Sequence, residues 1–383
     1  MLIIYRLSFI VYRLSFIVYR LSFIVYRLSF IVYRLSFYPA IILLFCKMQM
    51  YRIILTIGFY KKHHRVHDSY ILEYIWIDGR GNLRSKYRTA YPKFESYADM
   101  GSDNYIPVEH WNYDGFKAST ENNDIVLIPV AHYANPFFEP GRAFLILCDT
   151  HRDDGAPTET NFRRDAETVF ESGGRQDPWF SIKQEYFIIQ PGAEVVNFAQ
   201  DDEESQRYCC GVGSRTTTLR RLAEKHYEYC LRAGLKISGI NAEVAPSQWE
   251  FQIGPCSCIG AGDELWVARY ILHKLSEEFG VCISFQPKPV PVPPSTLNTK
   301  FSTEDSRDKN GLKYIYKYID RLSKKCSHDA GFAAADRGAS ASIRIPNSVL
   351  KAGCGYLEDR RPASDADPYQ VIAAIFSTAC SSQ

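Results

Sequence analysis

The sequence lacks several features that would assign a function directly. Its eleven cysteines include no Cys-x-x-Cys pair, so zinc-finger spacing is missing, and reduced thiols in a cytoplasmic protein explain them best. No glycine-rich P-loop is present. The formal net charge is only +2 and no basic stripe follows the chain, which argues against binding to nucleic acid. What remains is a chain of 383 residues, 46% of them hydrophobic, as expected for a globular protein with more than one domain.

Residues 1–67 contain no acidic residue and no uncharged run long enough to cross a membrane. The heptapeptide YRLSFIV repeats in tandem from Tyr5, and its arginine interrupts each apolar stretch before the roughly 20 residues that a span needs. A basic, serine-bearing leader without acids is also typical of a mitochondrial transit peptide. We interpret residues 1–67 as an extension or gene-prediction artefact outside the fold. Mitochondrial targeting and, after it, a membrane anchor are the alternatives.

The rest of the chain predicts two domains of the α+β class. Residues 68–152 are β-rich, with strands expected over Tyr70–Ile77, Leu83–Arg88, Ile125–His132 and Ala143–Asp149, and a turn over residues 111–115. Residues 153–383 mix helices with strands. The helices are expected over Asn161–Ser172, Thr217–Ala233, Asp263–Phe279, Lys309–Cys326 and Pro368–Ala379, and the strands over Pro178–Gln190 and Val281–Phe285. No βαβ alternation is present, which favours α+β over α/β.

Residues 237–255, ISGINAEVAPSQWEFQIGP, predict a β-hairpin. Two arms of alternating apolar residues flank a break at Pro246-Ser247, where a tight turn is expected. With that turn Glu243 lies directly opposite Glu250, and like charges about 5 Å apart on a strand pair need a cation or a shared proton between them. The alternative is a register shifted by one residue, with both acids solvated.

Three carboxylates, those of Glu185, Glu243 and Glu250, come from neighbouring predicted strands and can converge. Oxygen-only ligands suit Mg²⁺ or Mn²⁺. The C-terminal part adds arginines, the residue type that clamps phosphate, and Glu358 lies among them. These arginines are Arg337, Arg344, Arg360 and Arg361. A divalent cation beside arginines is typical of phosphoryl transfer, although the same residue types equally allow a structural ion-pair network.

From Tyr70 to Ala379 the chain resembles a eukaryotic-type glutamine synthetase. The similarity rests on the blocks WNYDG (111–115), PWFSIKQEY (178–186), YCCGVG (208–213), GINAEVAPSQWEFQIGP (239–255), LWVARYIL (265–272), PKPVP (287–291), FST (301–303), NGLKYI (310–315) and GYLEDRRPASDADPY (355–369). The resemblance implies an N-terminal β-grasp domain over 68–152 and a catalytic α+β domain over 153–383, assembled as a homo-oligomeric ring. It also implies a ligase that phosphorylates the side chain of glutamate with ATP and then replaces the phosphate by ammonia.

The resemblance further implies two metal sites. The first is held by three glutamates, which match Glu185, Glu243 and Glu250. The second, on the ATP phosphates, is held by a glutamate, a histidine and a further glutamate. Lys183 and Asn298 occupy the first two of these positions here, and only Glu358 remains. An ammonium cannot ligate a cation, so we expect the second site to be lost.

Further roles follow from the same resemblance. The nucleotide-side positions match Pro255, Ser302, Arg307, Arg344 and Tyr356. The catalytic positions match Asp114, which a neighbouring subunit gives to the ammonium site, Arg337, a transition-state arginine, and Arg360, beside the phosphate. Three family segments are altered: residues 292–300 replace the glutamate cradle, a flap is missing between 326 and 337, and a loop is missing before residue 208.

These departures leave two functions open. The family pattern predicts an ATP-dependent glutamate–ammonia ligase that uses Mg²⁺ or Mn²⁺. However, loss of a metal removes several kcal/mol of transition-state stabilisation, and a missing flap admits water to an acyl-phosphate. The alternative is a non-catalytic structural or interaction protein of the same fold, or a pseudogene product.

Overall fold

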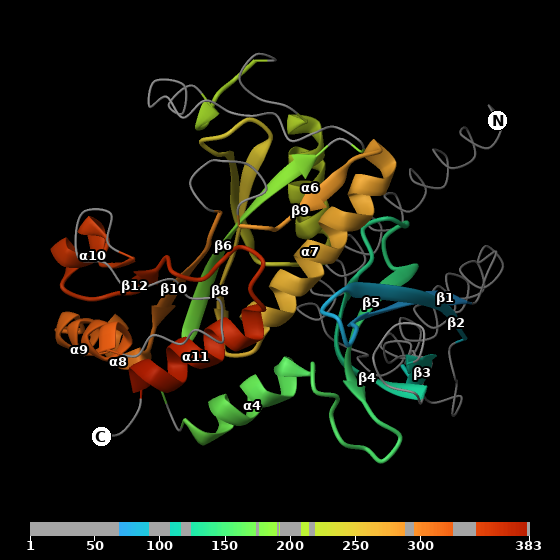
Figure 1. Cartoon of the computed structure of the whole chain (residues 1–383), viewed down its shortest axis with the longest axis horizontal. Helices are drawn as coiled ribbons and strands as arrows, with labels where there is room; N and C mark the ends of the chain where they lie inside the picture. The colour runs from blue at the N-terminus through green and yellow to red at the C-terminus, as the bar shows by residue number, and fades with distance from the viewer. Residues whose placement is uncertain are drawn as a thin grey trace, which may run out of the picture. The chain divides into compact units, whose positions relative to one another are not determined.

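The computed structural model divides the chain after Asp68, and the unit Ser69–Gln383 is the part described below (Figure 1). Its described residues are 69–91, 108–115, 124–173, 176–189, 191, 208–213, 219–287, 295–324 and 342–380. The leader 1–67 and Arg337 therefore lie outside the described residues. No helix within those ranges is long and apolar enough to cross a membrane.

A five-stranded sheet comes first along the chain. Its strands are β1 (Tyr70–Ile77), β2 (Leu83–Ala90), β3 (Trp111–Asp114), β4 (Asp124–Ala134) and β5 (Ala143–His151), in the order β2-β1-β5-β4-β3. Strands β1 and β5 run parallel, and the other pairs are antiparallel. The predicted hairpin β1–β2 and the predicted strands β4 and β5 are confirmed.

Strand β3 corrects one expectation, because residues 111–114 form an edge strand instead of a turn. Its two aromatic residues alternate with polar ones and lie against the sheet. Trp111 meets the ring of Tyr74 edge-on with centroids 5.3 Å apart, and Tyr113 stacks on Trp76 at 4.9 Å. Burial of these rings gives the period of two that defines a strand.

A seven-stranded antiparallel sheet, called the large sheet below, forms the second half. Its strands are β6 (Trp179–Ile189), β7 (Ile237–Ala242), β8 (Gln248–Ser257), β9 (Cys282–Ser284), β10 (Leu297–Ser302), β11 (Ile343–Arg344) and β12 (Leu357–Asp359). The order is β11-β12-β10-β6-β8-β7, and β9 pairs with the end of β6. The sequence did not predict β10 or β12. Strand β10 pairs with β6 along its whole length. The mixture of antiparallel strands and helices confirms the α+β class.

The five predicted helices begin and end within about three residues of their predicted positions, and two short helices, Glu304–Arg307 and Asn347–Ala352, were not predicted. The helices are α4 (Phe162–Ser172), α6 (Arg220–Ala233), α7 (Gly260–Phe279), α8 (Glu304–Arg307), α9 (Leu312–Lys324), α10 (Asn347–Ala352) and α11 (Pro368–Cys380). Helices α6 and α7 end at Gly234 and Gly280, both in the left-handed conformation that glycine adopts without steric cost. Helix α9 starts three residues later than expected, after Asn310 with a φ of 63°.

One face of the large sheet packs on the helices and is apolar. Phe180, Ile182 and Tyr186 of β6 and Phe251 of β8 are at most 1% exposed in the same cluster as Ile271 of α7. Side chains alternate between the two faces of a strand, so the residues between these positions, including Lys183 and Glu185, lie on the opposite face. Packing of the apolar face on α7, in a core cluster that α11 shares, thus presents a polar face on the other side.

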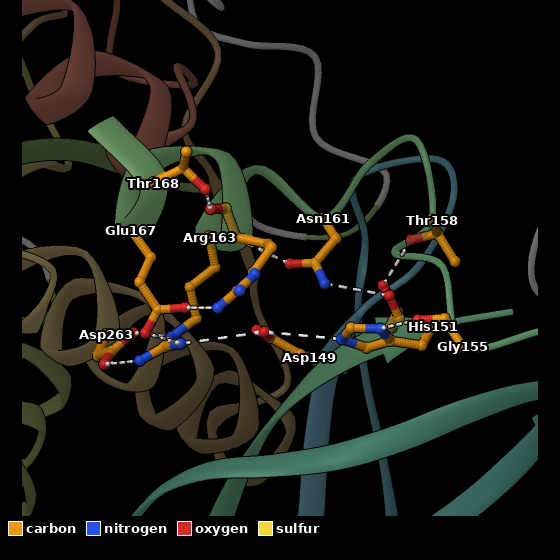
Figure 2. A network of polar contacts seen from close by, with 11 residues as sticks. Asp149, His151, Gly155, Thr158, Asn161, Arg163, Glu167, Thr168 and Asp263 are labelled. Atoms are coloured by element: carbon orange, nitrogen blue, oxygen red, sulfur yellow. Dashed lines mark hydrogen bonds and ion pairs between the residues drawn. The ribbon is translucent and has the colours of Figure 1, made fainter. Parts of the chain in front are cut away.

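A buried polar network joins the end of β5 to α4 and α7 (Figure 2). Arg163 of α4 donates two hydrogen bonds to the carboxylate of Asp263 on α7, at 2.8 and 3.1 Å. Its guanidinium also lies 3.9 Å from the carboxylate of Asp149, which in turn lies 3.9 Å from the His151 ring. Burial raises the pKa of Asp149. The network fixes α4 and α7 relative to the first sheet.

Replacement of Asn161 by alanine is expected to lower the free energy of unfolding by about 1–2 kcal/mol. Its side chain caps α4 by accepting from the backbone N–H of Arg164 at 3.3 Å and donates to the buried carbonyl of Thr150 at 3.1 Å. Urea denaturation measures the loss. Asn161→Ser keeps a capping oxygen and is expected to lose less; equal losses in the two variants would contradict a capping role.

Candidate functional site

The polar face of the large sheet brings together residues that the sequence predicted as ligands. Across β6 and β8, Glu185 lies directly opposite Glu250 and Lys183 opposite Gln252. Across β6 and β10, Lys183 lies directly opposite Asn298. The two departures from the family pattern are therefore cross-strand neighbours, and both stand next to the carboxylate pair.

The hairpin of β7 and β8 corrects the predicted register. The turn at Pro246-Ser247 forms as expected, with the N–H of Gln248 bonded to the carbonyl of Ala245 at 3.1 Å and Ser247 at a φ of 61°. Two residues before the turn stay outside the ladder, however, so that Glu250 pairs with Asn241 and the Glu243 N–H bonds to the Gln248 carbonyl. This shift of two residues keeps Glu243 and Glu250 on one face but places Asn241 opposite Glu250 on β7. Glu185 lies opposite Glu250 on the other neighbouring strand, β6.

Glu185 is the most strongly perturbed of these acids. Its carboxylate accepts from the N–H and the hydroxyl of Thr296, at 3.1 and 3.0 Å, and from the amide of Gln248 at 3.3 Å. Burial, and then the like charge of Glu243, raises the pKa of Glu185 to about 7. Burial and the charge of Glu250 likewise raise the pKa of Glu243. The charges of Glu185 and Glu243 are thus not fully compensated within the protein. A bound cation would stabilise the ionised form of both carboxylates.

Glu250 is different, because it already has a cation. Its carboxylate is 2% exposed and lies 2.9 Å from the ammonium of Lys183, whose side chain is 24% exposed. The amide of Gln252 donates to the same oxygen of Glu250 at 3.1 Å. A buried carboxylate that is paired and hydrogen-bonded in this way has its charge compensated within the protein.

The residues present do not fit a second divalent cation. Lys183 brings a positive charge to a ligand position, and the amide oxygen of Asn298 lies 3.0 Å from the hydroxyl of Thr296. The carboxylate of Glu358 accepts a short hydrogen bond from the guanidinium of Arg344. Within the described ranges, no group of three or more His, Cys, Asp or Glu side chains is close enough together to hold a metal ion. This applies to Glu185, Glu243 and Glu250 as well: their oxygens are the ligands that one divalent cation prefers, but the three carboxylates are not gathered around a metal position, and Lys183 is bonded to one of them.

Lys300 is a site residue that sequence reasoning missed. It lies on β10 directly opposite Ser181 of β6 and Glu358 of β12, on the same polar face. Its ammonium is 5.6 Å from the ring centroid of Tyr356. Burial, and then the positive charge of Lys183, lowers the pKa of Lys300. Asn298, Thr299 and Lys300 are three polar residues in a row, so no apolar alternation marks this strand in the sequence.

The predicted nucleotide-side residues lie on several elements: Pro255 on β8, Ser302 on β10, Arg307 on α8, Arg344 on β11 and Tyr356 directly before β12. Arg307 donates to the hydroxyl of Ser302 at 3.1 Å, pairs with Asp177 and lies over the ring of Trp179. Arg344 is half-exposed and bonded to Glu358, and Tyr356 stands beside Lys300. Pro255 is exposed near the end of β8.

The two predicted catalytic residues that the structure describes, Asp114 and Arg360, lie at different sheets. Asp114 lies on β3 of the first sheet, and Arg360 directly follows β12, with its N–H bonded to the carbonyl of Ser342 at 2.7 Å. Arg361, which the sequence placed among the phosphate-binding candidates, is 4% exposed and bonded to Asp359 at 2.9 and 2.6 Å and to the carbonyl of Leu322. It therefore holds the core together. Arg337 lies outside the described residues.

The raised pKa of Glu185 predicts a pH dependence of stability in protein freed of metal by a chelator. The folded-state pKa of about 7 exceeds the ordinary value of 4.5, so this group's contribution is fully present below pH 4.5 and is lost as the pH rises through 7. The loss is on the order of 3 kcal/mol. Urea denaturation from pH 4.5 to 8 measures it. Glu185→Gln is expected to flatten this slope, whereas the exposed Glu278→Gln should not; an unchanged slope in Glu185→Gln would contradict the assignment.

Comparison with known proteins points to one family. A sequence profile of the glutamine synthetase catalytic domain matches residues 160–331. Glutamine synthetase of Eremothecium gossypii is 41% identical over 338 residues, which cover 81% of this chain and 89% of that protein. That of Saccharomyces cerevisiae is 40% identical over 338 residues, with the same coverage. The protein named glutamine synthetase 2 cytoplasmic from Drosophila melanogaster is 39% identical over 340 residues, covering 80% of this chain and 90% of that protein.

Proposed function

Because this chain belongs to the glutamine synthetase family, we propose that the polar face of the large sheet binds ATP, glutamate and ammonia and catalyses their ligation to glutamine at a strongly reduced rate. The observation that carries this proposal is the cross-strand set of Glu185, Glu250 and Lys183. This set keeps carboxylates of the family's first metal site, and it has a lysine at a position where the family has a ligand of the second metal.

The site residues have two kinds of role in this reaction: carboxylates that would bind the metal, and arginines that would stabilise the phosphate charge. Glu185, Glu243 and Glu250 are the carboxylates that would have to draw together to hold one divalent cation, which when bound supplies positive charge beside the carboxylate of glutamate. Glutamate attacks the terminal phosphorus of ATP with its side-chain oxygen, and ADP leaves. Arg360 and Arg337 match the family's arginines that stabilise negative charge on the transferred phosphate. Ammonia, bound near Asp114 of a neighbouring subunit, adds to the carbonyl carbon and phosphate leaves.

The low rate follows from the second metal position. A metal at that position would stabilise transferred phosphate charge by several kcal/mol, and each 1.36 kcal/mol is a factor of ten in rate. The ammonium of Lys183, bonded to Glu250, supplies one charge where a divalent ion would supply two. The second candidate function is a ligand-binding protein without turnover. The ion pair between Lys183 and Glu250 favours it, because Lys183 is bonded to one of the three carboxylates that would bind the first metal.

The domain organisation and assembly belong to the same proposal. The five-stranded sheet with its parallel central pair β1–β5 supports a β-grasp domain over 68–152, followed by a catalytic domain over 153–383. A homo-oligomeric ring would bring Asp114 of one subunit to the carboxylates of the next. The cytoplasm is the proposed location, as the name of the Drosophila relative states for that protein, with mitochondria as the alternative if residues 1–67 act as a transit peptide.

The test is glutamine formation by the purified full-length chain with ATP, glutamate, ammonia and Mg²⁺ or Mn²⁺. The yeast relative, assayed in parallel, serves as the reference. We expect ammonia-dependent glutamine at a rate about 100-fold or more below that reference, abolished in Glu243→Gln and unchanged in the surface variant Lys324→Gln. A rate equal to the reference contradicts the proposed loss at the second metal position. No turnover, with ATP and glutamate still bound, establishes the non-catalytic alternative.

A further inference from the structure

Three cations lie within a run of four strands of the polar face, β6-β10-β12-β11, at the side where the family holds its second metal. They are Lys183 on β6, Lys300 on β10 and Arg344 on β11. Lys300 and Arg344 both lie directly opposite Glu358 on β12. Lys183 lies opposite Asn298, two residues from Lys300, which makes the two lysines diagonal neighbours on adjacent strands. Such neighbours are about 7–8 Å apart, within reach of one polyanion by long side chains.

Two of these cations are anchored by carboxylates. Lys183 is bonded to Glu250, and Arg344 to Glu358, with both carboxylates 2% exposed. The cationic side chains themselves reach further out, with exposed fractions of 24% and 48%. A buried carboxylate behind a partly exposed cation fixes the position of the charge. An ammonium has three N–H donors and a guanidinium five, so each of these cations can serve a second acceptor while it keeps the first.

The third cation has no such anchor. No ion pair joins Lys300 to a carboxylate in the part of the chain that the structure describes, although its side chain is half-buried. Burying an ammonium without a counter-ion is unfavourable, and an anion arriving at this face would remove the cost. A polyphosphate offers several acceptor oxygens, the chemistry that lysine and arginine side chains bind.

We propose that Lys183, Lys300 and Arg344 bind the triphosphate of ATP directly, so that the nucleotide is held without a divalent cation. This inference rests on the proposed function, since it takes the polar face to be the nucleotide site. The three fixed charges stand in for the metal that Lys183 and Asn298 exclude. Because free ATP carries more negative charge than its magnesium complex, cations that are part of the protein favour the free form.

The test is the equilibrium binding of ATP to the full-length chain, measured by titration calorimetry in excess EDTA and again in excess Mg²⁺. We expect the Kd in EDTA to be equal to or below the Kd in Mg²⁺. Lys183→Met and Lys300→Met are each expected to weaken binding in EDTA about 10-fold or more, the usual cost of a lost charged hydrogen bond. Lys183→Arg, which keeps the charge and the contact with Glu250, is expected to retain binding. Lys324→Gln, an exposed lysine of α9, is the matched control.

Each result decides between the two proposals. ATP binding in Mg²⁺ that disappears in EDTA overturns the metal-free inference and leaves the proposed function in place. ATP binding in neither buffer overturns the proposed function itself. Binding in EDTA that is unchanged in both methionine variants also overturns the inference, because the nucleotide would then be held elsewhere. Thermal unfolding of each variant ensures that a loss of binding is not a loss of fold, and the arginine variant remains informative if Lys183→Met does not fold.

Discussion

The double replacement Lys183→Glu and Asn298→His is expected to create a second Mn²⁺ site. The two residues lie directly opposite each other on β6 and β10. Glu358 lies on β12, the strand on the other side of β10. The substitutions exchange an ammonium and an amide for a carboxylate and an imidazole, both of which bind Mn²⁺. Equilibrium dialysis against Mn²⁺ is expected to show about one additional ion bound per chain.

Single variants separate the charge of Lys183 from the ligands that replace it. Lys183→Met removes the ammonium and leaves Glu250 without its partner, so it is expected to tighten Mn²⁺ binding to Glu185, Glu243 and Glu250 without adding an ion. Asn298→His alone is expected to add nothing, since the ammonium stays. Equal stoichiometry in the wild type and the double variant would show that Lys183 is not what excludes the metal.

The second large effect is expected at Asp263, where replacement by alanine should lower the free energy of unfolding by about 3–5 kcal/mol. Its carboxylate is 5% exposed, accepts two hydrogen bonds from Arg163 and accepts a third from the hydroxyl of Tyr369 at 2.7 Å. Removing it leaves the guanidinium of Arg163 buried, with only the more distant Asp149 and Glu167 near it. Urea denaturation at pH 7 measures the loss.

A surface ion pair provides the control for Asp263. Asp320 and Lys324 are i,i+4 neighbours on α9 with exposed fractions of 59% and 71%, so Asp320→Ala is expected to change stability by less than about 0.5 kcal/mol. The double variant Asp263→Leu, Arg163→Met removes both charges and is expected to recover part of the loss. A loss of under 1 kcal/mol in Asp263→Ala would contradict a structural role for the network in Figure 2.

The sequence predicted elements well where the apolar period is regular and bounded by turn residues. Helix α7, with its apolar residues and a glycine at residue 280, and the hairpin β1–β2 are examples. Strand β10 was missed because four of the six residues in LNTKFS are polar, three of them uncharged and one a lysine. Only its place between β6 and β12 makes it a strand, and that place depends on contacts far apart in the sequence.

The candidate site was predicted by its residue types but not by its pairing. Glu185, Glu243, Glu250 and Lys183 were identified as a group, and the large sheet puts them on one face. The direct opposition of Glu185 and Glu250 could not be derived, because β6 and β8 are far apart in the sequence and no turn between them fixes their register. Lys300 was missed for the same reason as β10. Family resemblance names positions, whereas the ion pair between Lys183 and Glu250 follows only from the register and the side-chain geometry.

A crystal structure of the chain with Mn²⁺ and a non-hydrolysable ATP analogue, with manganese located by its anomalous scattering, tests directly whether Lys183 replaces the second metal. We expect no manganese within ligand distance of Lys183, Asn298 and Glu358, an intact ion pair between Lys183 and Glu250, and phosphate oxygens in contact with Lys183 and Lys300. A manganese ion bound to Glu358 and the phosphates, with Lys183 turned away from Glu250, would contradict this replacement.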